Sequence, residues 1–444
     1  MSSKKLKDKS VAIIGTGIAG LSASWLLSRE YNITVYEKNN RIGGHSNTCY
    51  VDKTAVDTGF IVYNEKNYPN LISLFNYLGV KSCNTEMSFA ASLDSFEYSG
   101  KDFWSLIAEK KNIFRPRFWI MLKDIIRFYK QASSMAKDGN IEDITLGNFL
   151  LKYRYSNSFQ IYHLLPMASA IWSTPIENML NFPLKSFIYF SNNHGLLKFK
   201  NRPQWRTVIG GSQQYVKRLI SSFEDRIYIS RGVQSVWTDN GFVYVRDSFN
   251  NIDKYDKVII ASHADETLKI LKNPTLSEKN LLDKFAYQSN KVVLHKDARL
   301  MPKNKNCWSS WNYIADKKVL NKFCVTYWMN RLQNLDSHTN YFVTLNPIIM
   351  PKKDSILKTY SYDHPVFDKD AISAQRLIWN IQGKRNIWFC GSYFGYGFHE
   401  DALQSGLTVA ESISNIKRPW RVENASSRIN LPVGWSKILE KEVA

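Results

Sequence analysis

One glycine-rich turn near the N-terminus constrains the fold of this chain more than any other feature. The run GTGIAG at residues 15–20 follows a short apolar segment typical of a buried strand and opens a segment in which apolar residues recur at helical spacing. A second strand-like segment, residues 33–37, ends on Glu37, 20 residues beyond Gly17, where an acidic side chain accepts hydrogen bonds from an adenosine ribose. Strand, turn, helix and strand in this order predict a Rossmann-type βαβ unit that binds the pyrophosphate of a dinucleotide.

The residues of this turn have separate physical tasks. Gly15 permits the tight turn after the strand, Gly17 lets the backbone approach a pyrophosphate, and Gly20 lets the helix pack closely on the sheet. Ile18 and Ala19 begin the helix, whose free N–H groups and positive dipole end face the phosphates. All five are therefore expected to form the phosphate site.

A loop with one arginine and a pair of glycines, KNNRIGGHSNT at residues 38–48, follows directly. It resembles the extended fingerprint of the flavin-containing amine oxidase superfamily, which includes monoamine oxidases, protoporphyrinogen oxidases and phytoene desaturases. The resemblance implies non-covalently bound FAD, with this loop around its pyrophosphate and ribityl chain. It assigns to the cofactor Lys38, Arg41, Gly43, Gly44, His45 and Thr48. Physically, Arg41 offers phosphate a charge-assisted pair of hydrogen bonds.

Other segments resemble cofactor-contacting parts of the same superfamily. GSYFGYGFHEDAL at 391–403 follows an expected strand, 387–391, and opens an expected helix, 399–415. In the superfamily this motif meets the ribityl chain and points a helix N-terminus at the flavin edge that becomes negative on reduction. The resemblance assigns to FAD Gly391, Ser392, Gly397, Phe398 and His399, and from two other segments Gly59, Phe60 and Val233. Many relatives have an acid in place of Ser392, whose hydroxyl still suits a ribityl hydroxyl.

The reaction on the flavin is open among three classes, which are hydride removal from a carbon chain, amine oxidation, and a non-redox isomerase or mutase reaction. The segments 202–216 and 395–401 resemble a bacterial branch labelled "NAD/FAD-binding protein", which is associated with lipid-modifying enzymes of the cyclopropane-fatty-acid-synthase type. This favours a lipid or other hydrophobic substrate, with amine oxidase second. The candidate catalytic residues are Phe398, which offers a ring face without a phenol, and His399 and Glu400, which follow it beside the expected flavin edge.

Segments with the strand and glycine patterns of a dinucleotide-binding domain alternate along the chain with segments that lack these patterns. We therefore expect an α/β fold of the two-dinucleotide-binding-domain type, with a discontinuous α+β substrate-binding domain. The expected FAD-binding domain comprises residues 1–85, 203–265 and 380–417, the substrate-binding domain comprises 86–202 and 266–379, and a basic tail covers 418–444. Aromatic residues of the helical insert are expected to line an apolar substrate cavity or to belong to the core: Trp104, Phe118, Trp119, Tyr153, Tyr155 and Trp172.

A formal net charge of +20 in 444 residues predicts attraction to a polyanion. The basic amphipathic stretch 115–130 suits either an anionic membrane surface or an ordinary solvent-exposed face, and no nucleic-acid motif accompanies the charge. The chain has no apolar run of 18 residues and no apolar leader, so we expect a cytoplasmic protein. The charge leaves open whether it also makes peripheral contact with the anionic inner face of the membrane. Five scattered cysteines predict reduced thiols and no metal site, and the oligomeric state is open.

Overall fold

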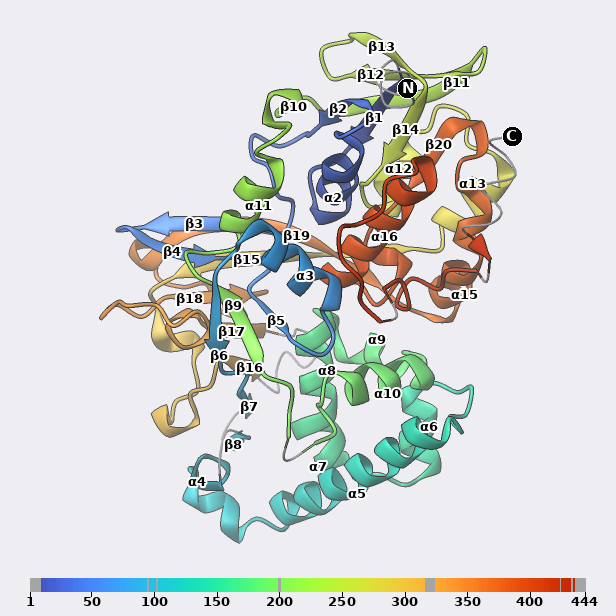
Figure 1. The fold of residues 1–444 in the computed structure, drawn as a ribbon. Helices are drawn as coiled ribbons and strands as arrows, with labels where there is room; N and C mark the ends of the chain where they lie inside the picture. The colour runs from blue at the N-terminus through green and yellow to red at the C-terminus, as the bar shows by residue number, and fades with distance from the viewer. Residues whose placement is uncertain are drawn as a thin grey trace.

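The computed structural model describes residues 9–93, 96–100, 103–198, 201–315, 324–423, 425–432 and 434–435. A five-stranded parallel sheet lies near one end of the molecule (Figure 1). Its strands in spatial order are β10 (Ile227–Tyr228), β2 (Asn32–Tyr36), β1 (Ser10–Ile14), β14 (Lys257–Ile260) and β20 (Ile387–Phe389). These strands come from the start, middle and end of the chain, as the discontinuous layout predicts. The apolar residues of β1 and β14 are buried, because both faces of a parallel sheet are covered.

Two helices that were predicted from the glycine motifs cross beside this sheet. The apolar spacing after the first glycine turn predicts a helix over 18–30, and α2 (Ile18–Leu27) ends three residues before that position. The second helix, α16 (His399–Ile413), ends two residues before the expected position 415. Gly406 of α16 lies at the crossing, where a methyl group on its Cα would come within 2.2 Å of the carbonyl oxygen of Ala19. The close approach of these two helices therefore requires a glycine. This contact packs a helix from the start of the chain against a helix from near its end.

The remaining strands form four sheets. A three-stranded antiparallel sheet comprises β11 (Val233–Asp239), β12 (Phe242–Asp247) and β13 (Ile252–Tyr255). The largest sheet has the order β19 (Ile356–Val366), β15 (Ala286–His295), β18 (Phe342–Leu345), β17 (Cys324–Trp328), β16 (Trp311–Ala315), β7 (Phe89–Leu93) and β8 (Phe96–Ser99). The small sheets are β3 (Thr48–Val51) with β4 (Thr54–Asp57), and β5 (Val62–Asn64), β9 (Trp205–Val208) and β6 (Ser82–Thr85). The seven-stranded sheet belongs to the expected substrate-binding domain, whose boundaries stay a prediction.

A helical insert occupies the other end of the molecule and is drawn in cyan to green in Figure 1. It comprises α4 (Phe103–Leu106), α5 (Pro116–Asp138), α6 (Leu146–Lys152), α7 (Asn157–Phe159), α8 (Leu165–Trp172), α9 (Ile176–Leu180) and α10 (Leu184–Asn193). The other helices are α3 (Pro69–Leu78), α11 (Gln213–Ile220), α12 (Ala264–Ile270), α13 (Leu276–Leu282), α14 (Met329–Leu332) and α15 (Lys369–Leu377). Among the described residues, no helix is both long enough and apolar enough to cross a bilayer.

The segment predicted as a basic tail, 418–444, packs against the cofactor domain as far as the structure describes it. The Trp420 ring stacks on Trp25 of α2 with centroids 5.9 Å apart. Arg428 forms an ion pair with the buried carboxylate of Asp401 at 2.6 Å. Trp420 and Arg428 of this segment thus have partners in the rest of the protein, and the boundary of the basic tail stays a prediction.

Candidate functional site

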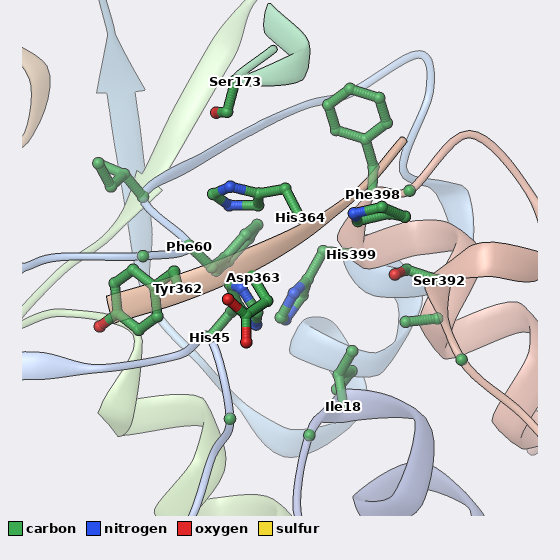
Figure 2. Close-up of a pocket in the computed structure, with 18 of the residues that line it drawn as sticks. Ile18, His45, Phe60, Ser173, Tyr362, Asp363, His364, Ser392, Phe398 and His399 are labelled. Carbon is green, nitrogen blue, oxygen red and sulfur yellow. The ribbon is translucent and has the colours of Figure 1, made fainter. Parts of the chain in front are cut away.

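Both glycine motifs border one elongated cavity of about 760 Å³, within the range of cofactor and ligand sites (Figure 2). The predicted cofactor residues that line it are Gly15, Gly17, Ile18, Ala19, Glu37, Lys38, Arg41, Gly44, His45, Gly59, Phe60, Val233, Gly391, Ser392, Gly397, Phe398 and His399. The turn after β1 and the turn before α16 thus share a cavity although more than 370 residues separate them in the chain. Their individual contacts with FAD stay predictions.

The turn between β1 and α2 leaves open space at one glycine only. A Cβ added to Gly17 would meet no atom within 4 Å, whereas a Cβ on Gly20 would lie 2.0 Å from the carbonyl oxygen of Gly15. A Cβ on Gly44 would lie 2.9 Å from the Cα of Gly17, so the two glycine loops touch. No acidic residue and no side-chain cap occupies the N-terminus of α2. The free N–H groups and the open space at Gly17 suit a pyrophosphate.

Three predicted cofactor residues do not line the cavity. Gly20 lies behind the turn, and Gly43 donates its N–H to the carbonyl of Thr16 at 3.1 Å, which fixes the loop. The hydroxyl of Thr48 donates to Asp57 Oδ1 at 2.6 Å. The hydroxyl of Thr48 thus holds a buried carboxylate, and the expected contact of Thr48 with FAD stays a prediction.

Glu37 lies at the end of the cavity where the adenosine ribose is expected. Its Oε2 accepts hydrogen bonds from the Thr16 hydroxyl at 2.5 Å and the Thr16 N–H at 3.1 Å, and its Oε1 accepts from the Asn39 N–H at 2.8 Å. The carboxylate therefore orders the phosphate turn as well as facing the cavity. Lys38 forms an ion pair with Glu266 of α12, and both residues line the same end.

The middle of the cavity contains a buried polar atom that the protein leaves without a partner. His45 Nε2 has no hydrogen-bond partner among the described residues, although the ring lines the cavity. Burial, aided by the neighbouring His364 and His263, holds the pKa of His45 well below its usual value. An unpaired buried nitrogen costs stability unless a ligand supplies a partner. This orphan atom and the open space at Gly17 fit a long polar cofactor such as FAD.

His364 of β19 is a cavity residue that sequence reasoning missed, and its partners fix the position of its proton. The N–H of Lys291 donates to Asn346 Oδ1 at 3.0 Å, so the amide nitrogen of Asn346 donates to Asn290 Oδ1 at 2.7 Å. Asn290 Nδ2 is consequently the donor to His364 Nδ1 at 2.8 Å. Burial lowers the pKa of His364 to about 4, so the neutral ring carries its proton on Nε2. His364 thus presents an N–H donor in the pocket (Figure 2).

His399 lies at the first turn of α16 and is also neutral. Its ring stacks on Phe60 with centroids 3.9 Å apart, and its Nε2 lies 2.7 Å from the hydroxyl of Tyr215. Burial lowers the pKa of His399 to about 3. The ring is therefore an uncharged part of the cavity wall, held in place by stacking on Phe60 and by the hydroxyls of Tyr215 and, at 3.5 Å, Ser46.

Glu400 is corrected from a catalytic candidate to a structural residue. It does not line the cavity, and its side chain is fully buried. Its carboxylate accepts hydrogen bonds from the N–H groups of Asn70 at 3.1 Å and Leu71 at 3.0 Å, which begin α3, and from Gln404 at 3.0 Å. Burial raises the pKa of Glu400, which these donors partly offset. The side chain caps α3, and its oxygen atoms do not face the cavity.

Beyond Phe398, where the flavin is expected, the cavity continues as an apolar chamber between α8, α10 and the seven-stranded sheet. Its lining includes Met87, Phe89, Met167, Ile171, Trp172, Phe190, Trp311, Tyr327, Leu332 and Leu345. Phe398 forms one wall, stacked on Phe190 with centroids 4.9 Å apart. Among the described lining residues, the carboxylates are Glu37, Glu266 and Asp363. The charge of Asp363 acts on His263 and Lys269 and also on His364, so this carboxylate lies near His364, whereas none of the chamber residues named above is acidic.

Among the aromatic residues expected to build the substrate cavity whose side chains the structure describes, only Trp172 lines it. Phe118 and Tyr155 are buried in the core of the insert and Trp119 is exposed. Tyr153 packs at the edge of that core. The side chain of Trp104 lies outside the described residues. Helical spacing alone does not separate core residues from cavity residues in this insert.

Comparison with known proteins places this geometry among flavoenzymes. Residues 13–78 match the family described as an NAD(P)-binding Rossmann-like domain. An L-amino-acid oxidase from Notechis scutatus scutatus is 20% identical over 466 residues, covering 91% of this chain and 87% of that protein. A flavin-containing amine oxidase from Danio rerio is 27% identical over 281 residues, covering 60% of this chain and 52% of that protein.

Solved structures share the fold along almost the whole chain. A triple mutant of putrescine oxidase superposes with a TM-score of 0.68 at 15% identity, over 91% of this chain and 98% of that one. A fatty acid isomerase from P. acnes, which produces CLA, superposes with a TM-score of 0.64 at 13% identity, over 92% and 99%. Identities this low establish the fold and leave the substrate open.

Proposed function

This chain belongs to the flavin-containing amine oxidase superfamily, and from that premise we propose that it removes a hydride from the acyl or other hydrophobic carbon chain of a lipid. FAD is its cofactor and oxidoreduction its reaction class. The proposed enzyme is a desaturase or oxidase. The observation that supports a lipid substrate is the apolar chamber at the flavin end of the cavity.

The chamber favours an uncharged carbon chain over an ammonium group. Each methylene transferred from water into such a site contributes about 0.8 kcal/mol, so a chain of several carbons gains several kcal/mol. An ammonium group would lose its hydration, and the apolar residues of the chamber would not compensate it; Asp363, the carboxylate that acts on His364, is not among them. Aromatic rings such as Phe398 and Phe190 could still face a cation, but they are weaker partners than a carboxylate.

The residues of the cavity bind and orient, and the redox chemistry belongs to the cofactor. When bound, FAD supplies the acceptor for the hydride that leaves the substrate carbon. We expect Glu37 to hold the adenosine ribose, the α2 N-terminus and Arg41 to hold the pyrophosphate, and the α16 N-terminus to face the flavin. His364 donates its Nε2–H within the cavity and cannot take a proton there, because Asn290 already occupies its Nδ1 lone pair. A desaturation therefore transfers one hydride to the cofactor and releases one proton to water, with no proton uptake by His364.

Arg202 suits the polar end of an amphiphilic substrate. It lines the same cavity beside Gly195 and Leu196, and its Nε donates to the carbonyl of Lys198 at 2.7 Å. A guanidinium at the margin of an apolar chamber matches the anionic head group of a lipid. Arg202→Gln should raise KM for a carboxylate-bearing chain and leave KM for the corresponding alcohol nearly unchanged. An equal rise for both would contradict this role.

Anaerobic titration of the FAD-loaded protein tests the proposal. Fatty acids and phospholipids should bleach the oxidised flavin spectrum, whereas primary amines and amino acids should not. Ile171→Trp, which fills the chamber, should abolish bleaching, and Ile161→Trp, on the exposed surface of the insert, is the matched control. Bleaching by amines alone would establish the amine oxidase alternative, which the curated relatives favour by name. Lipid conversion without a net change in flavin oxidation state would establish an isomerase, the activity named for one structural neighbour.

A further inference from the structure

Apolar side chains project from the helical insert at a place where the protein core does not use them. Phe114, which ends the short helical turn Lys110–Phe114, is 85% exposed, and Trp119 on the first turns of α5 is 54% exposed. Ile113 and Ile120 beside them are 38% and 47% exposed. The Trp119 Nε1–H donates to the carbonyl of Ile113 at 2.8 Å, so the turn and the helix form one continuous surface. We call these four residues the apolar tip.

Helix α5 has an ordinary core face, which does not account for the apolar tip. Phe118, Met121, Ile125 and Phe128 are buried on that face. The tip residues lie on the opposite side of the helix or on the turn before it. Their exposed surface therefore does not contribute to packing of the protein core. An exposed cluster of large apolar groups in one place indicates an interaction surface.

The charge around the apolar tip is predominantly positive, with Glu109 directly before the turn and Asp138 at the end of α5 as the flanking acidic residues. Basic residues between positions 110 and 137 are Lys110, Lys111, Arg115, Arg117, Lys123, Arg127, Lys130 and Lys137. The acidic residue in this stretch, Asp124, is 6% exposed, accepts the N–H of Ser156 at 2.9 Å and lies 3.2 Å from Arg127. Its charge is thus directed into the protein, and the exposed face of α5 is cationic.

We propose that the apolar tip and the cationic face of α5 bind the surface of an anionic lipid bilayer. Tryptophan and phenylalanine insert at the boundary between head groups and acyl chains, while lysine and arginine meet anionic head groups. Figure 1 shows α4 and α5 at the edge of the molecule farthest from the parallel sheet, where a flat bilayer can approach them. Nucleic acid would use the cations and leave the projecting Phe114 without a partner, so the bilayer fits the surface better.

Rings connect the docking helix to the wall of the apolar chamber. The ring centroids of Phe128 in α5 and Phe187 in α10 are 6.4 Å apart. The centroid of Phe187 lies 5.7 Å from that of Trp172, which lines the chamber. The helix on the bilayer and the helices around the chamber are therefore one packed unit. That the membrane delivers the substrate rests on the proposed function, whereas binding to the bilayer does not.

Flotation with vesicles tests the proposal on the full-length FAD-loaded protein. The wild type should bind vesicles of equal parts phosphatidylglycerol and phosphatidylcholine and should bind pure phosphatidylcholine at least tenfold more weakly. The double variant Phe114→Gln/Ile120→Gln should bind the anionic vesicles roughly tenfold more weakly or worse, because about 1.4 kcal/mol of lost apolar burial is a factor of ten. The matched control is Phe249→Gln, a 67% exposed phenylalanine in the β12–β13 turn near the opposite end of the molecule.

A charge-reversal pair tests the second half of the surface. Lys123→Glu/Lys130→Glu should weaken vesicle binding, whereas Lys353→Glu/Lys358→Glu, with the same change in net charge elsewhere, should weaken it far less. Flavin absorbance and melting temperature verify that each variant is folded. No binding by the wild type, or equal binding by the Phe114 and Phe249 variants, would overturn the proposal. Two further outcomes would overturn the proposal in favour of another partner. The first is a wild type that dimerises without lipid, with dimers that the Phe114→Gln/Ile120→Gln variant does not form. The second is an affinity of the wild type for DNA equal to its affinity for anionic vesicles. Binding without lipid turnover would leave docking intact and count against the proposed reaction.

Discussion

Replacing Gly17 with alanine should separate cofactor binding from folding. The backbone at Gly17 has φ −65° and ψ 170°, which alanine adopts without strain, and the added methyl group would meet no protein atom within 4 Å. The apo protein should therefore be as stable as the wild type or gain about 0.4 to 1 kcal/mol, since alanine restricts the unfolded chain. The methyl group would instead occupy the space expected for the pyrophosphate. Loss of one or two hydrogen bonds to a charged phosphate costs about 3 kcal/mol, which is roughly a hundredfold in Kd.

Gly20→Ala is the matched control in the same motif. Its methyl group would lie 2.0 Å from the carbonyl oxygen of Gly15, so the helix must shift and the apo protein should lose about 1 to 3 kcal/mol of stability. The assays are thermal unfolding of both apo variants and FAD titration followed by flavin fluorescence. If Gly17→Ala binds FAD within about twofold of the wild type, the phosphates do not pass Gly17 and the assignment of the turn is wrong.

The remaining predictions concern side chains whose partners the structure identifies. Asn290→Leu should free the Nδ1 of His364, so nitrogen NMR of labelled imidazole should show a mixture of tautomers, and an unchanged spectrum would contradict the hydrogen-bond chain. Glu400→Ala should leave two N–H groups at the start of α3 without their acceptor and cost about 2 kcal/mol or more, while turnover per bound flavin stays within about twofold. A turnover loss of several orders of magnitude with an unchanged melting temperature would restore Glu400 as a catalytic residue. Stability should fall as the pH drops from about 6.5 towards 4, because His163, His194, His364 and His399 have lowered pKa values and stay neutral in the folded chain while the unfolded chain takes up protons. Asp57, whose pKa burial raises to about 6, opposes this trend in part, and urea unfolding that is equally stable at both ends of this range would contradict it.

The dinucleotide-binding half of the fold could be predicted because its signals are local. Residues 11–20 contain an apolar run, a glycine turn and a helical pattern within ten positions, and the structure places β1 and α2 there. Glu37 is also found by spacing, because β2 must end at the same sheet edge as β1. The helix ends were less accurate, since α2 and α16 end where tertiary packing allows and not where the apolar pattern fades.

His364 and Glu400, near the expected position of the flavin, could not be assigned correctly from a pattern of neighbouring residues in the sequence. His364 lies in the long strand β19, and the residue that fixes its proton, Asn290, is 74 positions away on β15. Glu400 occupies a position in the sequence motif that suggests catalysis, yet its carboxylate caps a helix 330 positions away. The roles of such side chains depend on which strands and helices pack together in the fold. The spacing of residues within one segment does not contain that information.

A crystal structure of the FAD complex soaked with a long-chain fatty acid tests the central claim most directly. The predicted result is one FAD molecule with its adenosine ribose at Glu37, its pyrophosphate at Gly17, its flavin ring beside His364 and Phe398, and the acyl chain in the chamber lined by Trp172. A flavin ring outside this cavity, or an acyl chain bound away from the chamber, would contradict the account.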